Sequence, residues 1–103
     1  VYNSAIPKFE KLIEVNYKPA ENNYYLGDML FKRKKYDQAI VHFKKSAMLN
    51  DKASYMPTLL LNSAISFENT KDKDNAKNFY STLIELYPNS KEAKTAKTNL
   101  NKL

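Results

Sequence analysis

The sequence predicts an all-α protein built from antiparallel helix pairs, and three observations support this prediction. Apolar residues recur at three- and four-residue spacing along nearly the whole chain. Glycine occurs once in 103 residues, which leaves few positions for the tight turns of a β-sheet. Residue types also repeat along the chain at intervals of 34 and 37 positions. Together these features predict about six helices, short loops and no strand.

The helix boundaries follow from prolines and capping residues. Pro19 and Pro57 lie where the second and fourth helices should begin, because proline is tolerated in a first turn. Asp72 is placed to cap the fifth helix, and Pro88 should end it. Asn89 resembles the start of a capping box before the sixth helix, with a glutamate three residues later. The expected helices span roughly residues 3–15, 20–34, 36–49, 56–69, 73–87 and a last one from about 90.

The internal repeat identifies the architecture. Its pattern is a tyrosine, an alanine three residues later and an aromatic residue four positions after that. The copies are Tyr2, Ala5 and Phe9, then Tyr36, Ala39 and Phe43, and finally Ala76 and Tyr80 without the tyrosine. A 34-residue period of helix pairs is that of the tetratricopeptide repeat, and the interval of 37 is this period with a three-residue insertion near Tyr55.

We therefore expect a single tetratricopeptide-repeat domain over residues 1–103. It should comprise the second helix of a truncated repeat (1–19), two whole repeats (20–53 and 54–90) and a closing helix (91–103). Because one helix pair cannot bury its own apolar stripe, neighbouring repeats must stack. Starting in mid-repeat predicts that the chain is a fragment of a longer protein, whose upstream helix is missing here.

Stacked helix pairs need small residues where helices cross and bulky residues to fill the space between repeats. Glycine and alanine occur at the predicted crossings, and aromatic residues occur one turn away. The predicted packing residues are Gly27, Tyr36, Ala39, Phe43, Ala64, Phe67, Ala76 and Tyr80.

Three segments resemble the C-terminal domain of the YbgF/CpoB family, the periplasmic Tol-Pal system proteins that coordinate cell division. They are Tyr24–Asp28 with its Leu-Gly pair, Lys35–Ile40 followed by Phe43, and Leu86–Ser90 followed by two alanines. The resemblance covers nearly the whole chain. The family's tryptophan before Leu-Gly is Tyr25 here, and the Tyr-Pro ending is absent from the first whole repeat. Similar repeat endings also occur in outer-membrane-assembly lipoproteins, which are the alternative within this class.

The resemblance implies a non-enzymatic periplasmic adaptor. Family members bind TolA through this domain and help to couple peptidoglycan synthesis to envelope constriction during cell division. They trimerise through an N-terminal coiled coil, which, like the signal peptide, falls outside this fragment.

Composition limits the chemistry that the chain can perform. The absence of cysteine excludes disulfides and thiol chemistry, and the single histidine, His42, argues against histidine-based catalytic or metal sites. We expect no cofactor, no metal, no small-molecule substrate and, because no apolar run reaches about 18 residues, no membrane span. The net charge of +6 and the basic run Lys32–Lys35 leave open a binder of nucleic acid or another anionic surface. That function is disfavoured because Arg33 is the only arginine.

The first helices of the two whole repeats should form a concave, partner-binding surface. A mixture of aromatic, aliphatic and a few charged side chains is typical of an interaction groove. The predicted groove residues are Tyr24, Asp28, Phe31, Lys32, Leu61 and Ile65. Packing against neighbouring helices is the alternative role for the apolar members. A clamp for a terminal carboxylate is improbable, because the lysine and asparagine that it needs are Tyr24 and Asp28 here.

Overall fold

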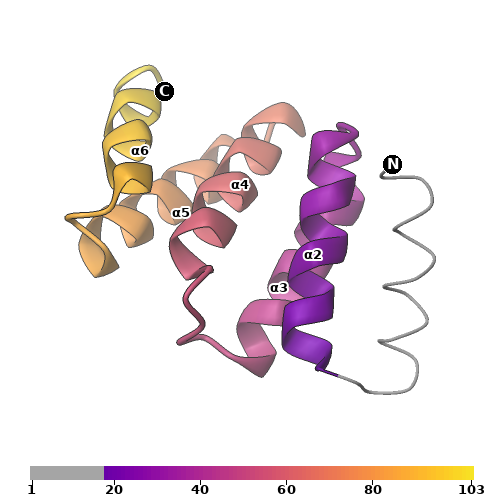
Figure 1. Ribbon diagram of the computed structural model, residues 1–103. Coiled ribbons are helices and arrows are strands. Elements are labelled where there is room, and N and C mark those ends of the chain that lie inside the picture. Colours follow the sequence, from indigo (N-terminus) through magenta and orange to yellow (C-terminus); the bar gives the residue numbers. More distant parts are fainter. Residues whose placement is uncertain (1–17) are drawn as a thin grey trace. The chain divides into compact units, whose positions relative to one another are not determined.

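The computed structural model describes residues 18–103, and these form helices and no strand. The helices are α2 (Pro19–Lys32), α3 (Tyr36–Leu49), α4 (Met56–Asn69), α5 (Lys73–Leu86) and α6 (Lys91–Asn101) (Figure 1). The helix expected at residues 3–15 lies outside the described residues. The chain divides into two compact units, Val1–Ala53 and Ser54–Leu103, each of which is described by itself.

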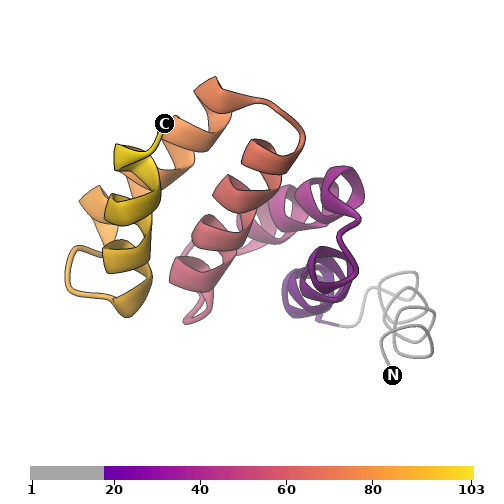
Figure 2. The ribbon, with the colours of Figure 1, turned by 90° about the horizontal axis from the view of Figure 1, so that it is seen from above.

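In the first unit, α2 and α3 pack against each other as an antiparallel pair (Figures 1 and 2). Their shared core contains Leu26 and Leu30 from α2 and Phe43 from α3, all of which are buried. Gly27 faces the Phe43 ring so closely that a Cβ at this position would lie 2.7 Å from Phe43 Cδ1. A glycine is therefore needed here for contact rather than for backbone freedom, because no larger residue leaves room for the ring.

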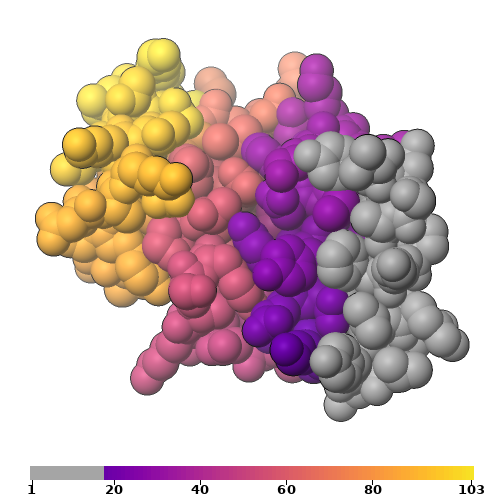
Figure 3. Space-filling model, viewed as in Figure 1, coloured from indigo at the N-terminus to yellow at the C-terminus, as the bar shows by residue number. Residues whose placement is uncertain are grey.

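In the second unit, α4, α5 and α6 all contact one another, and Figure 3 shows α6, in yellow, covering part of the surface of this unit. Its core includes two aromatic rings, those of Phe67 and Tyr80, and Tyr80 is wholly buried. Ala64 replaces the glycine of the first pair. Ser63 and Phe67 stand where the first pair has Leu26 and Leu30. The larger Phe67 side chain thus compensates for the smaller Ser63 side chain.

The helix starts agree with the sequence, with one correction. Proline lies in the first turn of both α2 and α4, and the Asp72 carboxylate accepts a hydrogen bond from the Asn75 amide at 3.2 Å. The prediction that Asn89 caps α6 was wrong: Ser90 is the N-cap and its hydroxyl accepts from the Ala93 amide at 3.0 Å. The short serine side chain on extended backbone reaches that amide directly.

The turns that end α2 and α4 have the same geometry, and the turn after α2 ends this helix two residues before the expected position. Lys34 and Lys71 adopt the left-handed backbone conformation, with φ of 62° and 65°. After α2, the amides of residues 34 and 35 donate to the carbonyls of Phe31 and Leu30 at 2.9 Å each. After α4, the same two bonds recur 37 residues later. This pair of bonds is the Schellman motif, which favours glycine at the position that lysine occupies here.

Replacing Lys71 with glycine should raise the free energy of unfolding by up to about 1 kcal/mol. The left-handed conformation costs a residue with a Cβ about 1–2 kcal/mol, and the larger unfolded-state entropy of glycine offsets part of the gain. Chemical denaturation measures the change. As a control, Lys77→Gly inside α5 should lower stability by about 1 kcal/mol through helix propensity. Equal losses in both variants would contradict the assignment of this turn.

Candidate functional site

The predicted groove residues of the first repeat share one face of α2. Tyr24, Asp28 and Phe31 are partly exposed at spacings of four and three residues, which places them in line along the helix. The Tyr24 ring lies 5.4 Å from the Tyr25 ring and 6.2 Å from that of Phe43. These contacts hold a half-exposed aromatic ring in place, as a preformed anchor for a partner requires.

The far end of this face is fixed in a similar way. The Phe31 ring packs edge-on against Tyr36 at the start of α3, with ring centroids 5.8 Å apart. Lys32 Nζ lies 2.9 Å from the Asp28 carboxylate, so the two charges form an ion pair one helical turn apart. Ion pairs between residues four apart on a helix contribute only a few tenths of a kcal/mol to its stability.

The predicted groove residues of the second repeat also share a helix face. Leu61 and Ile65 lie four residues apart on α4, and both are partly exposed. Two further residues of α4 take part in contacts within the unit. The Thr58 hydroxyl donates to Glu92 on α6 at 2.9 Å, and Glu68 accepts a hydrogen bond from the Tyr80 hydroxyl. Because the two units are described separately, a groove that joins the faces of α2 and α4 remains a prediction.

The predicted packing residues lie inside the helix pairs. Gly27, Ala39, Phe43, Ala64, Phe67, Ala76 and Tyr80 are buried, and Tyr36 is partly exposed. Tyr80 has a second role that the apolar pattern did not indicate. Its hydroxyl donates to Glu68 on α4 and accepts from Asn99 on α6 at 3.2 Å. Burial and the neighbouring Glu68 carboxylate raise the pKa of Tyr80, so the phenol stays protonated and links three helices.

A polar pair between α2 and α3 was not found from the sequence. His42 Nδ1 lies 3.0 Å from Asn23 Oδ1, and Asn23 Nδ2 donates to the Pro19 carbonyl at 2.8 Å. Because Asn23 Nδ2 already donates to Pro19, the atom of Asn23 that faces the histidine is the acceptor Oδ1. His42 therefore donates a hydrogen bond from Nδ1 to this oxygen. Burial, and then the Lys45 charge, lower the pKa of His42. The repeat pattern could have indicated this pair. Leu60 and Phe79 occupy the equivalent positions 37 residues later, so two polar residues stand where the other repeat has two apolar ones.

The basic run Lys32–Lys35 has local structural roles. Lys32 pairs with Asp28, Arg33 caps α2 and Lys34 forms the left-handed turn. Cations at the C-terminus of a helix also interact favourably with its dipole. In residues 18–103, no three acidic, histidine or cysteine side chains gather into a group able to hold a metal ion. None of the helices in this part of the chain combines the length and the hydropathy needed to cross a membrane.

Comparison with known proteins shows which class this architecture defines. The chain is similar in structure to the tetratricopeptide-repeat domain of Arabidopsis OM64, with a TM-score of 0.84 and 20% sequence identity. The match covers 98% of this chain and 81% of the OM64 chain. The fold is therefore that of a tetratricopeptide-repeat domain.

The match to a family model covers a smaller part of the chain than the structural match does. Residues 58–90 match the family model of the tetratricopeptide repeat, a range that covers α4 from its third residue, all of α5 and the turn that leads to α6. No curated protein matches the chain. The helix-pair repeats expected from the sequence are thus confirmed, whereas membership of the Tol-Pal family stays a prediction.

The lowered pKa of His42 predicts how stability depends on pH. Between the lowered folded value and the ordinary value of 6.5, the unfolded chain binds a proton that the folded chain does not. The contribution of His42 to the free energy of unfolding should therefore be complete above about pH 6.5. It should decline as the pH falls below this value.

Denaturation of the wild type and of His42→Gln at a series of pH values measures this effect. His42 is the only histidine, so the difference between the two curves isolates its titration from that of the carboxylates. The wild type should lose stability relative to His42→Gln between about pH 7 and pH 5. Parallel curves would contradict a half-buried histidine that is neutral in the folded chain.

Proposed function

We propose that this chain is the partner-binding module of a periplasmic adaptor that binds a TolA-like protein and coordinates envelope constriction with cell division. The tetratricopeptide-repeat fold supports the general function of protein binding. The resemblance of three segments to the YbgF/CpoB family supports the choice of partner, the connection to peptidoglycan synthesis and the periplasmic location.

The observation that carries the proposal is the face of α2. Tyr24 and Phe31 are partly exposed aromatic residues, and ring contacts with Phe43 and Tyr36 hold them in place. Binding energy in protein interfaces concentrates in a few such aromatic anchors. Asp28 and Lys32 lie beside these anchors and supply charges of both signs to orient a partner segment.

The faces of α2 and α4 contribute differently to this proposal. Leu61 and Ile65 on α4 offer aliphatic surface without an adjacent charge pair. We therefore assign the main anchors to α2 and additional apolar contact to α4. Substitutions in each helix test the two contributions separately.

Tyr24→Ala and Phe31→Ala should each weaken binding of the periplasmic domain of TolA at least tenfold, because truncation at an interface hot spot costs about 2 kcal/mol or more. Titration calorimetry measures the affinity, and circular dichroism checks that the helical content is unchanged. Asp28→Asn removes a charge with little change in shape and should weaken binding about twofold to fivefold.

Lys94→Ala and Lys97→Ala on α6 are the matched controls, because both lysines are exposed and lie on a helix outside the proposed face. They should bind TolA as the wild type does. If the α6 variants lose binding and the α2 variants retain it, the partner uses a different face.

The full-length gene sequence distinguishes this adaptor from the alternatives in its class. A signal peptide followed by a coiled-coil region supports the Tol-Pal assignment. A signal peptide followed by a lipidated cysteine indicates an outer-membrane-assembly lipoprotein instead. A gene without any signal peptide contradicts both.

A further inference from the structure

The last turn of α3 presents two large apolar side chains to solvent. Met48 is 86% exposed and Leu49 is 55% exposed. Each lies within the first unit, at the end of the helix pair where α2 begins. Exposed apolar residues that lie next to each other and beside a hollow are a feature of binding surfaces.

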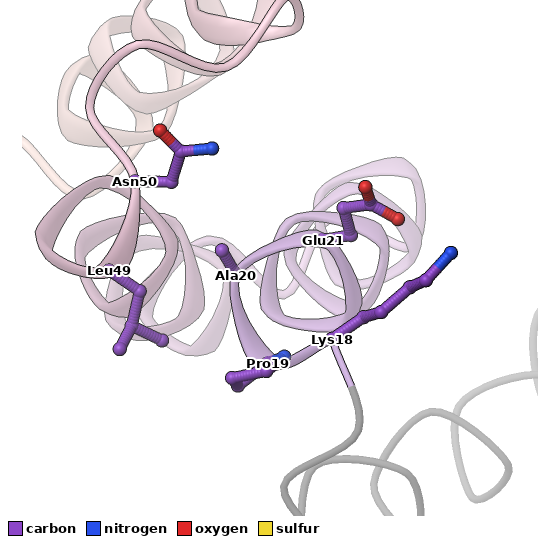
Figure 4. A pocket seen from close by; sticks show the side chains of 6 residues that line it. All are labelled: Lys18, Pro19, Ala20, Glu21, Leu49 and Asn50. Atoms are coloured by element: carbon purple, nitrogen blue, oxygen red, sulfur yellow. The ribbon is translucent and has the colours of Figure 1, made fainter.

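Two hollows flank Leu49. The first has a volume of about 370 Å³ and lies between the start of α2 and the end of α3 (Figure 4). It is lined by Lys18, Pro19, Ala20, Glu21, Leu49 and Asn50. The second has a volume of about 200 Å³ and is lined by Asn23, Lys45, Met48 and Leu49. Leu49 lines both hollows, and we call the residues around the two hollows the α2/α3 end surface.

Hydrogen bonds within the pair hold the α2/α3 end surface in shape. The buried Ser46 hydroxyl donates to the Ala20 carbonyl at 2.6 Å and ties the first turn of α2 to α3. Asn23 Nδ2 donates to the Pro19 carbonyl, and Asn23 Oδ1 contacts His42. Small residues in the first turn of α2 leave the space open, and this network keeps it open. A preformed surface of this kind binds with little ordering cost.

The charge around the α2/α3 end surface is mainly positive. Lys18 and Lys45 line the two hollows, and Glu21 is the one acidic residue among the residues that line them. Residues 18–53 together carry eight basic residues against four acidic ones. A second copy of this chain would bring the same lysines and meet repulsion. An acidic segment would be attracted.

We propose that the α2/α3 end surface binds a segment of a partner protein in which a large apolar side chain is flanked by acidic residues. The apolar side chain fills the hollow beside Leu49 and covers Met48, and the carboxylates lie near Lys18 and Lys45. This surface is separate from the aromatic face proposed for the TolA-like partner, so the module has two places for a protein ligand.

The probe is an acetylated, amidated octapeptide of alternating leucine and aspartate, added to the isotope-labelled chain and followed by amide chemical shifts. Saturable shifts should appear in residues 18–23 and 45–50. Leu49→Ser should weaken binding at least tenfold, and Lys45→Gln should weaken it about threefold. Because both side chains are exposed, neither change should alter the circular dichroism spectrum.

Leu86→Ser is the matched control, because Leu86 ends α5 as Leu49 ends α3 and is 61% exposed. It should bind the probe as the wild type does. Phe31→Ala lies at the opposite end of α2 and should also leave this binding unchanged, even if it abolishes binding of TolA. The two proposals can therefore fail independently.

Four results would overturn the inference. The first is equal binding of a leucine–lysine octapeptide, which would remove the role of charge. The second is equal weakening of binding by Leu49→Ser and Leu86→Ser. The third is that the chemical-shift changes are confined to other residues. The fourth is a dimer in sedimentation experiments that Leu49→Ser dissociates, which would make a second copy the occupant.

Discussion

The close approach of Gly27 to the Phe43 ring is the contact on which the first helix pair depends. A Cβ at residue 27 would lie only 2.7 and 2.8 Å from two carbons of the Phe43 ring. Leu26 and Leu30, on the same helix as Gly27, are both buried. Within the same helix pair, the Ser46 hydroxyl reaches the Ala20 carbonyl and His42 contacts Asn23. The α2/α3 end surface and the Tyr24 anchor both rest on this geometry, since Tyr24 contacts the same ring.

The second unit solves the same packing problem with other side chains. Ala64 stands where the first pair has Gly27, and its methyl group leaves slightly less room for a neighbouring side chain. Phe67 and Phe79 form an aromatic contact with ring centroids 5.0 Å apart. Tyr80 adds a polar link to Glu68 and Asn99, so α6 is held by hydrogen bonds as well as by apolar contact. Where the first pair has Asn23 and His42, the second has Leu60 and Phe79. The helix pairs thus share backbone geometry and turns, whereas their surfaces and polar groups differ.

Much of the fold could be predicted from the sequence because its signals are local. Apolar spacing, the prolines and Asp72 define helix boundaries within one or two residues. The predicted end of the second helix at residue 34 was two residues late, because periodicity does not show that Lys34 leaves the helix for a left-handed turn. The Asn89 cap was wrong for a related reason: two adjacent residues can both cap, and backbone conformation decides between them.

The candidate binding surfaces were harder to predict, because contacts between helices determine which side chains are paired and which are exposed. Periodicity places Tyr24, Asp28 and Phe31 on one face but does not show that Asp28 pairs with Lys32. Nor does it show that Met48 and Leu49 are exposed, because apolar residues are usually expected to be buried. The links from Ser46 to Ala20 and from Asn23 to His42 join residues 26 and 19 positions apart. Polar residue types alone do not specify such partners.

The most direct test of this account is a double-mutant cycle between Gly27→Ala and Phe43→Leu, measured by chemical denaturation. Gly27→Ala alone should destabilise the chain by about 1–2 kcal/mol, because overpacking against the ring exceeds the gain of about 1 kcal/mol in helix propensity. In the Phe43→Leu background the added methyl group finds room, so the same change should cost at least about 1 kcal/mol less. If Gly27→Ala instead raises stability in both backgrounds by the same amount, the close approach of glycine and ring does not govern the packing of this helix pair.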